Sequence, residues 1–133
     1  MASANVARVQ GIYEAFATGD VPAVLGAMSP AMVWSEAENF PYADRNPYEG
    51  PEAILEGVFM RLATEWEGFG ATPEQFLDAG DHVIALGRYT GVLRATGKAI
   101  DAQFAHVWRL AEGKTVSFQQ YTDTLQVAEA ARG

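Results

Sequence analysis

The chain has 133 residues, and its 9 Lys and Arg against 17 Asp and Glu give a net charge of −8 at pH 7. This acidic balance argues against binding to DNA, RNA or an anionic membrane surface, because such binding depends on clustered basic side chains. With 49% hydrophobic residues, the chain can bury the core of one domain, and we predict a single domain over residues 1–133.

Cysteine is absent, and the chain has two histidines, His82 and His106. Disulfides and thiolate metal sites are therefore excluded, and we predict no metal and no cofactor. The apolar stretches are shorter than the roughly 20 residues of a membrane span, and the chain does not begin with a basic segment followed by an apolar one. We expect a cytoplasmic protein with no membrane or nucleic-acid partner.

Two helices are predicted near the start of the chain. The first covers 3–18, because apolar residues recur at steps of three and four, and Gly19 ends it. Asp20 is a good N-cap for the second, which we expect to stop at Ser29-Pro30. The stripe of the first helix comprises Val6, Val9, Ile12, Tyr13 and Phe16.

A strand over 31–37 and a loop over 39–50 come next. Two prolines, two asparagines and a glycine in the loop argue against regular structure there. A third helix is expected to begin at Gly50-Pro51, since proline favours the first helical turn. Its apolar face would comprise Ile54, Leu55, Val58, Phe59, Leu62 and Trp66.

From about Thr72 the pattern changes to near-alternation of apolar and polar residues, which is typical of strands. Turn dipeptides at Gly80-Asp81, Thr96-Gly97 and Glu112-Gly113 divide these strands into an antiparallel meander. Helices followed by a sheet predict an α+β domain.

Pairing across the central hairpin predicts an open space above one face of the sheet. A two-residue turn at Thr96-Gly97 would place large side chains opposite small ones, all on the same face. The helices must cover this face to bury their own stripes, so the aromatic side chains would line a pocket or, alternatively, fill a dry core. The predicted pairs are Tyr89 with Phe104, Gly87 with His106 and Ala85 with Trp108.

The opposite face of the hairpin mixes apolar and cationic side chains. Such a surface suits a partner subunit, so we expect a homodimer through the outer face of the sheet. The residues concerned are Leu86, Arg88, Val92, Val107 and Arg109.

The register of the last strand is open. A two-residue turn at Glu112-Gly113 would put Gln119, Tyr121 and Asp123 on the face of His106. A three-residue loop with Gly113 left-handed would instead put Phe118, Gln120 and Thr122 there.

The order of these elements resembles the SnoaL-like and ketosteroid-isomerase-like branch of the nuclear transport factor 2 superfamily. The resemblance covers nearly the whole chain and implies a cone-shaped, curved antiparallel sheet wrapped around three helices. It is carried by the segments YEAFATGD (13–20), WSE (34–36), NPYEGPEAI (46–54), LGRYTGVLRATGK (86–98), FAHVWRLAEGK (104–114) and FQQYTDT (118–124).

The resemblance also suggests site residues. The general base of the isomerases corresponds to Glu36, within a one-residue gap, and their oxyanion-binding acid corresponds to His106. In those isomerases this acid is kept protonated by its apolar site, so that it can donate a hydrogen bond. Their catalytic tyrosine aligns near Ile12, one place from Tyr13, which departs from the isomerase pattern. Epoxide hydrolases of the superfamily have a catalytic aspartate at the position where this chain has Gln120.

Some SnoaL-type cyclases use an acid near the end of the last strand, which makes Asp123 a candidate. A carboxylate there could equally satisfy the sheet edge or the C-terminal turn. The superfamily includes isomerases, dehydratases, epoxide hydrolases, cyclases and binding proteins without chemistry, so its fold does not define a reaction.

Chemically, Glu36 among aromatic side chains would have a raised pKa and could remove a proton from carbon, while His106 donates a hydrogen bond to the developing oxyanion. A rim position, or pairing with Arg45, is the alternative for Glu36, and a hydrogen-bonded core position is the alternative for His106. The predicted substrate-binding residues are Trp34, Tyr89, Phe104, Trp108, Phe118 and Gln120.

We therefore predict a cofactor-independent isomerase, lyase or cyclase for a small, mostly apolar carbonyl or enol compound. A non-catalytic small-molecule-binding protein of the same fold, and a dimeric scaffold with a filled core, are the alternatives.

Overall fold

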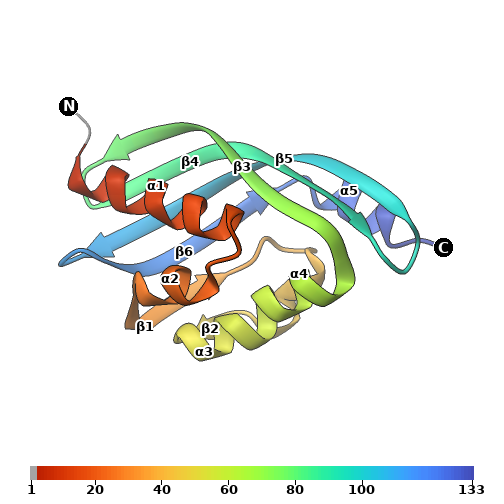
Figure 1. The fold of residues 1–133 in the computed structure, drawn as a ribbon, viewed down its shortest axis with the longest axis horizontal. Helices are drawn as coiled ribbons and strands as arrows, with labels where there is room; N and C mark the ends of the chain where they lie inside the picture. Colours follow the sequence, from red (N-terminus) through yellow and green to blue (C-terminus); the bar gives the residue numbers. More distant parts are fainter. Residues whose placement is uncertain (1–2) are drawn as a thin grey trace.

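The computed structural model describes residues 3–133 (Figure 1). Its first half contains α1 (Ala4–Ala17), α2 (Val21–Gly26), β1 (Met28–Ser35), a 3-10 helix η1 (Pro41–Arg45), β2 (Tyr48–Glu49), α3 (Pro51–Ile54), a π-helical turn η2 (Leu55–Phe59) and α4 (Met60–Glu65). Its second half contains β3 (Trp66–Ala79), β4 (His82–Leu93), β5 (Lys98–Ala111), β6 (Lys114–Thr122) and α5 (Thr124–Ala130).

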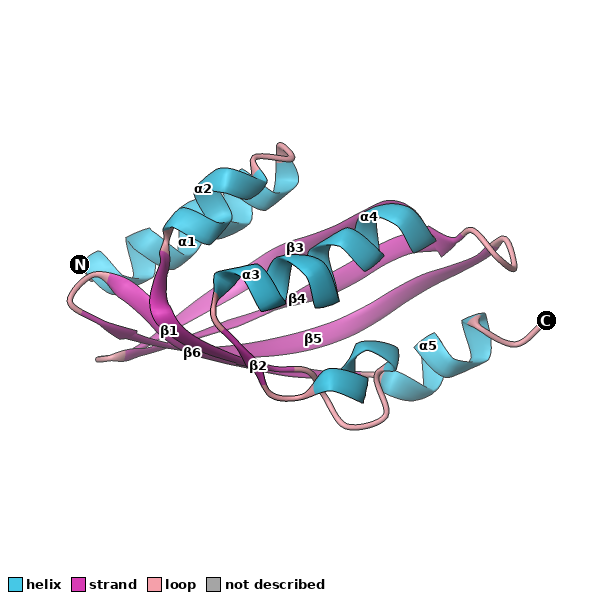
Figure 2. Cartoon of the chain, turned by 90° about the horizontal axis from the view of Figure 1, so that it is seen from below, coloured by secondary structure: helices cyan, strands magenta, loops and turns pink. Residues whose placement is uncertain are grey.

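The strands form one curved sheet in the order β2-β1-β6-β5-β4-β3. Helices α1 to α4 cover one face of this sheet, and α5 lies apart from them and contacts β5 (Figure 2). The predicted α+β class with a curved sheet wrapped around helices is confirmed. The predicted antiparallel pairing is confirmed for every pair of strands except β1 and β6, which run parallel. The long stretch of chain between these two strands makes a parallel crossover possible.

The first two helices begin and end where local chemistry predicts. The Ser3 hydroxyl accepts a hydrogen bond from the Val6 amide at 3.0 Å, and Gly19 follows α1 with a φ of +77°. Asp20 caps α2 through the Ala23 amide at 3.2 Å. The predicted stop at Ser29-Pro30 is wrong, because α2 ends at Gly26 and Pro30 lies inside β1. Proline is tolerated there because the pairing of β1 with β6 is interrupted between Met28 and Val33.

The segment 39–50 has more regular structure than predicted. It contains η1 and the short strand β2, which pairs with β1. The third helix does begin at Pro51, and α3, η2 and α4 form one continuous helical run to Glu65. Trp66 then starts β3, so the meander begins six residues before the predicted Thr72.

The central hairpin closes with a longer turn than predicted. Arg94–Gly97 form a four-residue turn, and Leu93 pairs with Lys98. The predicted partners are therefore wrong by two residues: Ala85 lies opposite His106, and Gly87 opposite Phe104. A shift of two leaves every side chain on the same face, because side chains alternate with a period of two. The prediction that these side chains share one face is confirmed.

The register of β6 combines both alternatives. Glu112 and Gly113 form the two-residue turn, and each has a positive φ. Leu110 then pairs with Thr115 but Arg109 with Ser117, so Val116 is an extra residue in β6. This bulge reverses the two faces of the rest of the strand. Phe118 and Gln120, rather than Gln119 and Tyr121, consequently lie on the His106 face, and Gln120 pairs with His106.

Gly87 allows β3 to bend over the sheet. A Cβ at this position would lie 2.1 Å from the Thr72 carbonyl oxygen and 2.8 Å from Pro73 Cα. We expect Gly87→Ala to lower the free energy of unfolding by about 3 kcal/mol in urea titrations, because backbone atoms must shift. As a control, Gly11→Ala meets no atom within 4 Å and should raise the stability by about 0.5–1 kcal/mol. Equal effects of the two substitutions would contradict this explanation.

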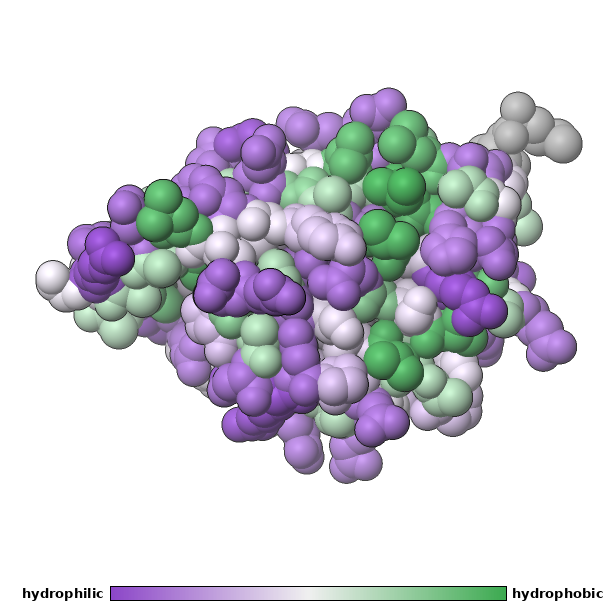
Figure 3. Space-filling view, turned by 180° about the vertical axis from the view of Figure 1, so that it is seen from behind, coloured by the Kyte–Doolittle hydropathy of each residue, from purple (hydrophilic) through white to green (hydrophobic). Residues whose placement is uncertain are grey.

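The outer face of the sheet is mixed in character. Figure 3 shows apolar side chains interspersed with polar ones on this side of the molecule. Tyr121 is 57% exposed there, and Arg88 forms an ion pair of 2.7 Å with Asp101. The homodimer through this face stays a prediction. Within residues 3–133, no helix is both long and apolar enough to cross a membrane.

Candidate functional site

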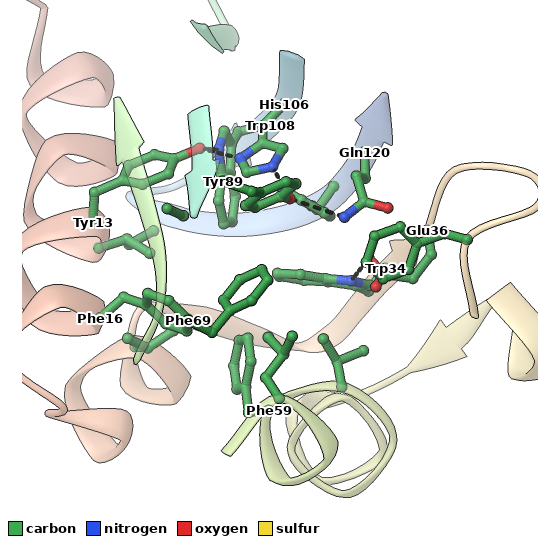
Figure 4. A pocket seen from close by; sticks show the side chains of 17 residues that line it. Tyr13, Phe16, Trp34, Glu36, Phe59, Phe69, Tyr89, His106, Trp108 and Gln120 are labelled. Carbon is green, nitrogen blue, oxygen red and sulfur yellow. Dashed lines mark hydrogen bonds between the residues drawn. The ribbon is translucent and has the colours of Figure 1, made fainter. Parts of the chain in front are cut away.

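A small cavity lies between the inner face of the sheet and helices α1 and α4 (Figure 4). Its volume is about 50 Å³, which is room for roughly four water molecules at about 10–15 Å³ each. Most of its wall is aromatic or aliphatic, and five of the lining side chains besides the tryptophans carry polar groups. These are Tyr13, Glu36, Tyr89, His106 and Gln120.

His106 lies between two tyrosine hydroxyls. Its Nδ1 atom is 2.5 Å from the hydroxyl oxygen of Tyr13, and its Nε2 atom is hydrogen-bonded to the hydroxyl of Tyr89. Tyr13 comes from α1, Tyr89 from β4 and His106 from β5, so three elements meet at this row. The imidazole also stacks on Phe104, with ring centroids 3.9 Å apart.

Each tyrosine hydroxyl accepts one further hydrogen bond. The indole Nε1 of Trp108 donates to the Tyr13 oxygen at 2.9 Å, and Nε2 of Gln120 donates to the Tyr89 oxygen at 2.9 Å. The other end of the Gln120 amide is also fixed, because its Oε1 accepts from the Ala37 backbone amide at 3.0 Å. The five side chains therefore form one continuous row of hydrogen bonds, which we call the tyrosine–histidine row. It comprises Trp108, Tyr13, His106, Tyr89 and Gln120.

Burial sets the ionisation of this row. His106 is 4% exposed, and burial in apolar surroundings lowers its pKa well below the ordinary value. Burial raises the pKa of Tyr13 and of Tyr89 well above theirs. The imidazole is consequently neutral and both phenols are protonated at neutral pH.

Glu36 is the buried carboxyl of the cavity. It is 3% exposed, and its Oε2 accepts a hydrogen bond of 2.9 Å from Nε1 of Trp34, two residues earlier on the same face. Desolvation raises the pKa of Glu36 to about 7, with the Trp34 bond and the charge of Arg61 opposing this rise. Two bonds to Asn46, of 2.9 and 2.8 Å, hold the Glu36 backbone amide and carbonyl. The rim position and the pairing with Arg45 are therefore wrong.

Most of the predicted binding residues reach the cavity. Phe104 is an exception, because it packs beneath the His106 ring and does not line the space. Asp123 is also absent from the lining: it is exposed and caps α5 by accepting from the Gln126 amide at 3.2 Å. The structure thus places Asp123 at the start of the C-terminal helix, which agrees with the alternative that this carboxylate satisfies the C-terminal turn. Those that line the cavity are Trp34, Tyr89, Trp108, Phe118 and Gln120, with Glu36 and His106.

Sequence reasoning missed the contribution of Tyr13. Its position in the buried stripe of α1 was predicted, but its contact with His106 depends on how α1 lies across the sheet. A hydroxyl in an otherwise apolar stripe needs a buried hydrogen-bond partner, and this was the available signal. Further lining residues from the helices, from β3 and from the loop before η1 were also not predicted as binding residues: Phe16, Phe40, Phe59, Leu62 and Phe69.

No group of three His, Asp or Glu side chains in the described part of the chain, 3–133, is arranged to hold a metal ion. The polar atoms of the cavity are instead one carboxyl group and one row of neutral donors and acceptors. Such a set can transfer a proton and can bind an oxygen atom.

A helix-covered, curved sheet enclosing an aromatic cavity with a few buried polar groups defines a cone-shaped α+β domain with an internal cavity. Residues 9–118 match the SnoaL-like domain family, and the chain belongs to this family. No curated protein matches the sequence.

Solved structures agree with this family and fold. The chain is 40% identical to an NTF2-like protein from Burkholderia thailandensis, with 100% of both chains covered and a TM-score of 0.93. An NTF2-like protein of unknown function from Burkholderia pseudomallei is 26% identical, with 99% of this chain and 100% of that chain covered and a TM-score of 0.90. TerC, co-crystallised with polyporic acid, is 24% identical over 96% of this chain and 98% of its own, with a TM-score of 0.85.

Proposed function

We propose that this protein is a cofactor-independent acid–base enzyme of the isomerase, lyase or cyclase type, acting on a small, mostly apolar carbonyl or enol compound. The observation that carries the proposal is the position of Glu36, a buried carboxyl with a pKa of about 7, in the same cavity as the tyrosine–histidine row. A general base is most effective when its pKa lies near the working pH.

In the proposed reaction, the Glu36 carboxylate removes a proton from the carbon next to a carbonyl group. The electron pair of the broken C–H bond forms a C=C bond, and the carbonyl π electrons move to oxygen, giving an enolate. The tyrosine–histidine row donates a hydrogen bond to this oxygen and stabilises its charge. Return of the proton to another carbon gives an isomer, whereas loss of a leaving group gives a lyase product.

The walls of the cavity support an apolar and compact substrate. Trp34 stacks on Phe118 at 3.7 Å between ring centroids, and Phe59 packs edge-on against Trp34 at 5.5 Å. A volume of about 50 Å³ is smaller than the ~150 Å³ of a cavity known to bind benzene. A ring-sized substrate therefore requires lining side chains to move, and Phe16, which is half-buried, lies at the edge of the core.

Hydrogen exchange in D₂O tests the proposal without knowledge of the natural substrate. Small cyclic ketones are incubated with the protein, and loss of the α-hydrogen signals is followed by proton NMR. We expect the protein to accelerate exchange for at least one ketone, and Glu36→Gln to reduce that acceleration by about 10²–10⁴-fold, because the amide cannot accept the proton. Glu38→Gln, which changes an exposed carboxylate two residues away, is the matched control and should leave the rate unchanged.

If ketones bind but none exchanges faster than in buffer, the enzyme proposal is wrong. That outcome favours the second candidate, a non-catalytic protein that binds a small molecule in the same cavity. The apolar walls suit either function, and only Glu36 favours the enzyme.

A further inference from the structure

The central three residues of the tyrosine–histidine row carry more polar hydrogens than the two hydrogen bonds between them can use. Two contacts, Tyr13 to His106 and His106 to Tyr89, each need one hydrogen. A neutral imidazole supplies one N–H, and two phenols supply two O–H groups, which makes three hydrogens for the two contacts. The flanking groups, Trp108 and Gln120, only donate to this row and so take up none of the three.

One hydrogen is therefore left over, and it always belongs to a tyrosine. If His106 carries its hydrogen on Nε2, it donates to Tyr89, and Tyr13 donates to Nδ1; the Tyr89 hydrogen is then spare. If His106 carries its hydrogen on Nδ1, it donates to Tyr13, and Tyr89 donates to Nε2; the Tyr13 hydrogen is then spare. The two arrangements are equivalent in number of bonds, because each phenol oxygen has one flanking N–H donor.

We propose that the cavity binds one hydrogen-bond-accepting oxygen, of a ketone, enolate or phenolate, through the spare tyrosine hydrogen, and that the tautomer of His106 selects whether Tyr13 or Tyr89 donates it. The proposal rests on the proposed function, since it names the ligand atom and its donor at that site. His106 then acts as a positioning residue, because both of its ring nitrogens are occupied by the tyrosines.

The geometry supports this role for both tyrosines. Tyr13 and Tyr89 both line the cavity and lie on either side of His106 (Figure 4). Gln120 is held at both ends, because its Nε2 donates to Tyr89 and its Oε1 accepts from the Ala37 amide; its second Nε2 hydrogen is the competing donor that the double tyrosine variant below distinguishes from the tyrosines. Among the described residues, every buried side-chain nitrogen and oxygen already has a hydrogen-bond partner. No buried side-chain acceptor of the protein therefore needs the spare hydrogen.

The tautomer is measured directly by ¹⁵N NMR of the His106 ring. Tyr13→Phe removes the partner of Nδ1, so His106 should carry its hydrogen on Nε2 and donate to Tyr89. Tyr89→Phe should give the opposite tautomer. The same tautomer in both variants, or a protonated ring at neutral pH in the unsubstituted protein, would overturn the proposal.

Ligand binding is measured with two probes of similar shape, cyclopentanone and methylenecyclopentane, by NMR titration. They differ in a C=O against a C=CH₂ group, so the ratio of their affinities reports the hydrogen bond alone. We expect either single Tyr→Phe variant to keep this ratio within about threefold, since the other tyrosine can donate, and the double variant Tyr13→Phe/Tyr89→Phe to lower it at least about tenfold. Unfolding curves confirm that each variant is folded.

The outcomes separate this proposal from the enzyme proposal. Glu36→Gln leaves the row intact, so it should bind cyclopentanone with the same preference even though exchange is lost. If the unsubstituted protein prefers cyclopentanone over methylenecyclopentane but does not accelerate hydrogen exchange of any ketone, the enzyme proposal is refuted and the acceptor site is not. No binding of cyclopentanone to the unsubstituted protein, or an unchanged ratio in the double variant, would refute the acceptor site.

Discussion

Replacing Glu36 by Gln is expected to make the protein more stable at alkaline pH, by about 3 kcal/mol at pH 8.5 relative to the effect at pH 4. The pKa of Glu36 is about 7 in the folded protein, against 4.5 for an unperturbed group. Between these values the folded state keeps a proton that the unfolded state releases, so stability falls as the pH rises from about 4.5 to 7 and is then constant. Each pKa unit corresponds to about 1.4 kcal/mol.

Below pH 4.5 both states are protonated, and the carboxyl contributes no pH-dependent penalty. Comparing the two proteins at each pH removes the titration of every other group, including His106, whose lowered pKa acts in the opposite direction. Urea titrations between pH 4 and 8.5 measure the difference. A constant difference at every pH would show that Glu36 is not held protonated by burial, and Glu38→Gln should change the stability by less than about 0.5 kcal/mol throughout.

Replacing His106 by Phe is expected to lower the free energy of unfolding by about 2–6 kcal/mol at pH 8. The new ring keeps the aromatic contact with Phe104, so little packing is lost. Two buried hydroxyls, of Tyr13 and Tyr89, each lose a hydrogen-bond partner, and each such loss costs about 1–3 kcal/mol. The measurement is urea unfolding at a pH where the imidazole is neutral.

The second histidine provides the matched control. His82 lies beside a turn, with its side chain 41% exposed and 2.8 Å from Asp81, so His82→Phe should change stability by less than about 0.5 kcal/mol. A loss below 1 kcal/mol for His106→Phe would mean that water or a rearranged tyrosine replaces the imidazole. That result would also weaken the assignment of His106 as the group that positions both phenols.

Local chemistry was readable from the sequence alone. The helix boundaries at Ser3, Gly19, Asp20 and Pro51 follow from caps and backbone preferences that act within a few residues. The inner face of the central hairpin was also readable, because the turn is longer than predicted by two residues and an even shift keeps the same side chains inside. This is why Tyr89 and His106 were assigned correctly to one face.

The register of the last strand could not be predicted from local sequence. The turn at Glu112-Gly113 has the two-residue length of one alternative, yet the extra residue Val116 moves Gln120 to the inner face and Gln119 to the outer one, as the other alternative had them. A bulge depends on how β5 and β6 twist together with the parallel strand β1, and no residue near Val116 indicates it. Asp123 was a candidate acid because some SnoaL-type cyclases use an acid near the end of this strand. In the structure the strand ends at Thr122, and Asp123 caps α5.

The residue types at the site were thus determined by the sequence: a carboxyl after a tryptophan on one strand, and a histidine among aromatics on another. Tertiary structure alone decided their relations. The way α1 crosses the sheet brings the Tyr13 hydroxyl to His106, and the Asn46 contacts with the Glu36 backbone hold that carboxyl at the cavity. The first contact joins residues 93 apart in the chain and the second joins residues 10 apart across a loop, whereas periodicity and caps report only on neighbours within about four residues.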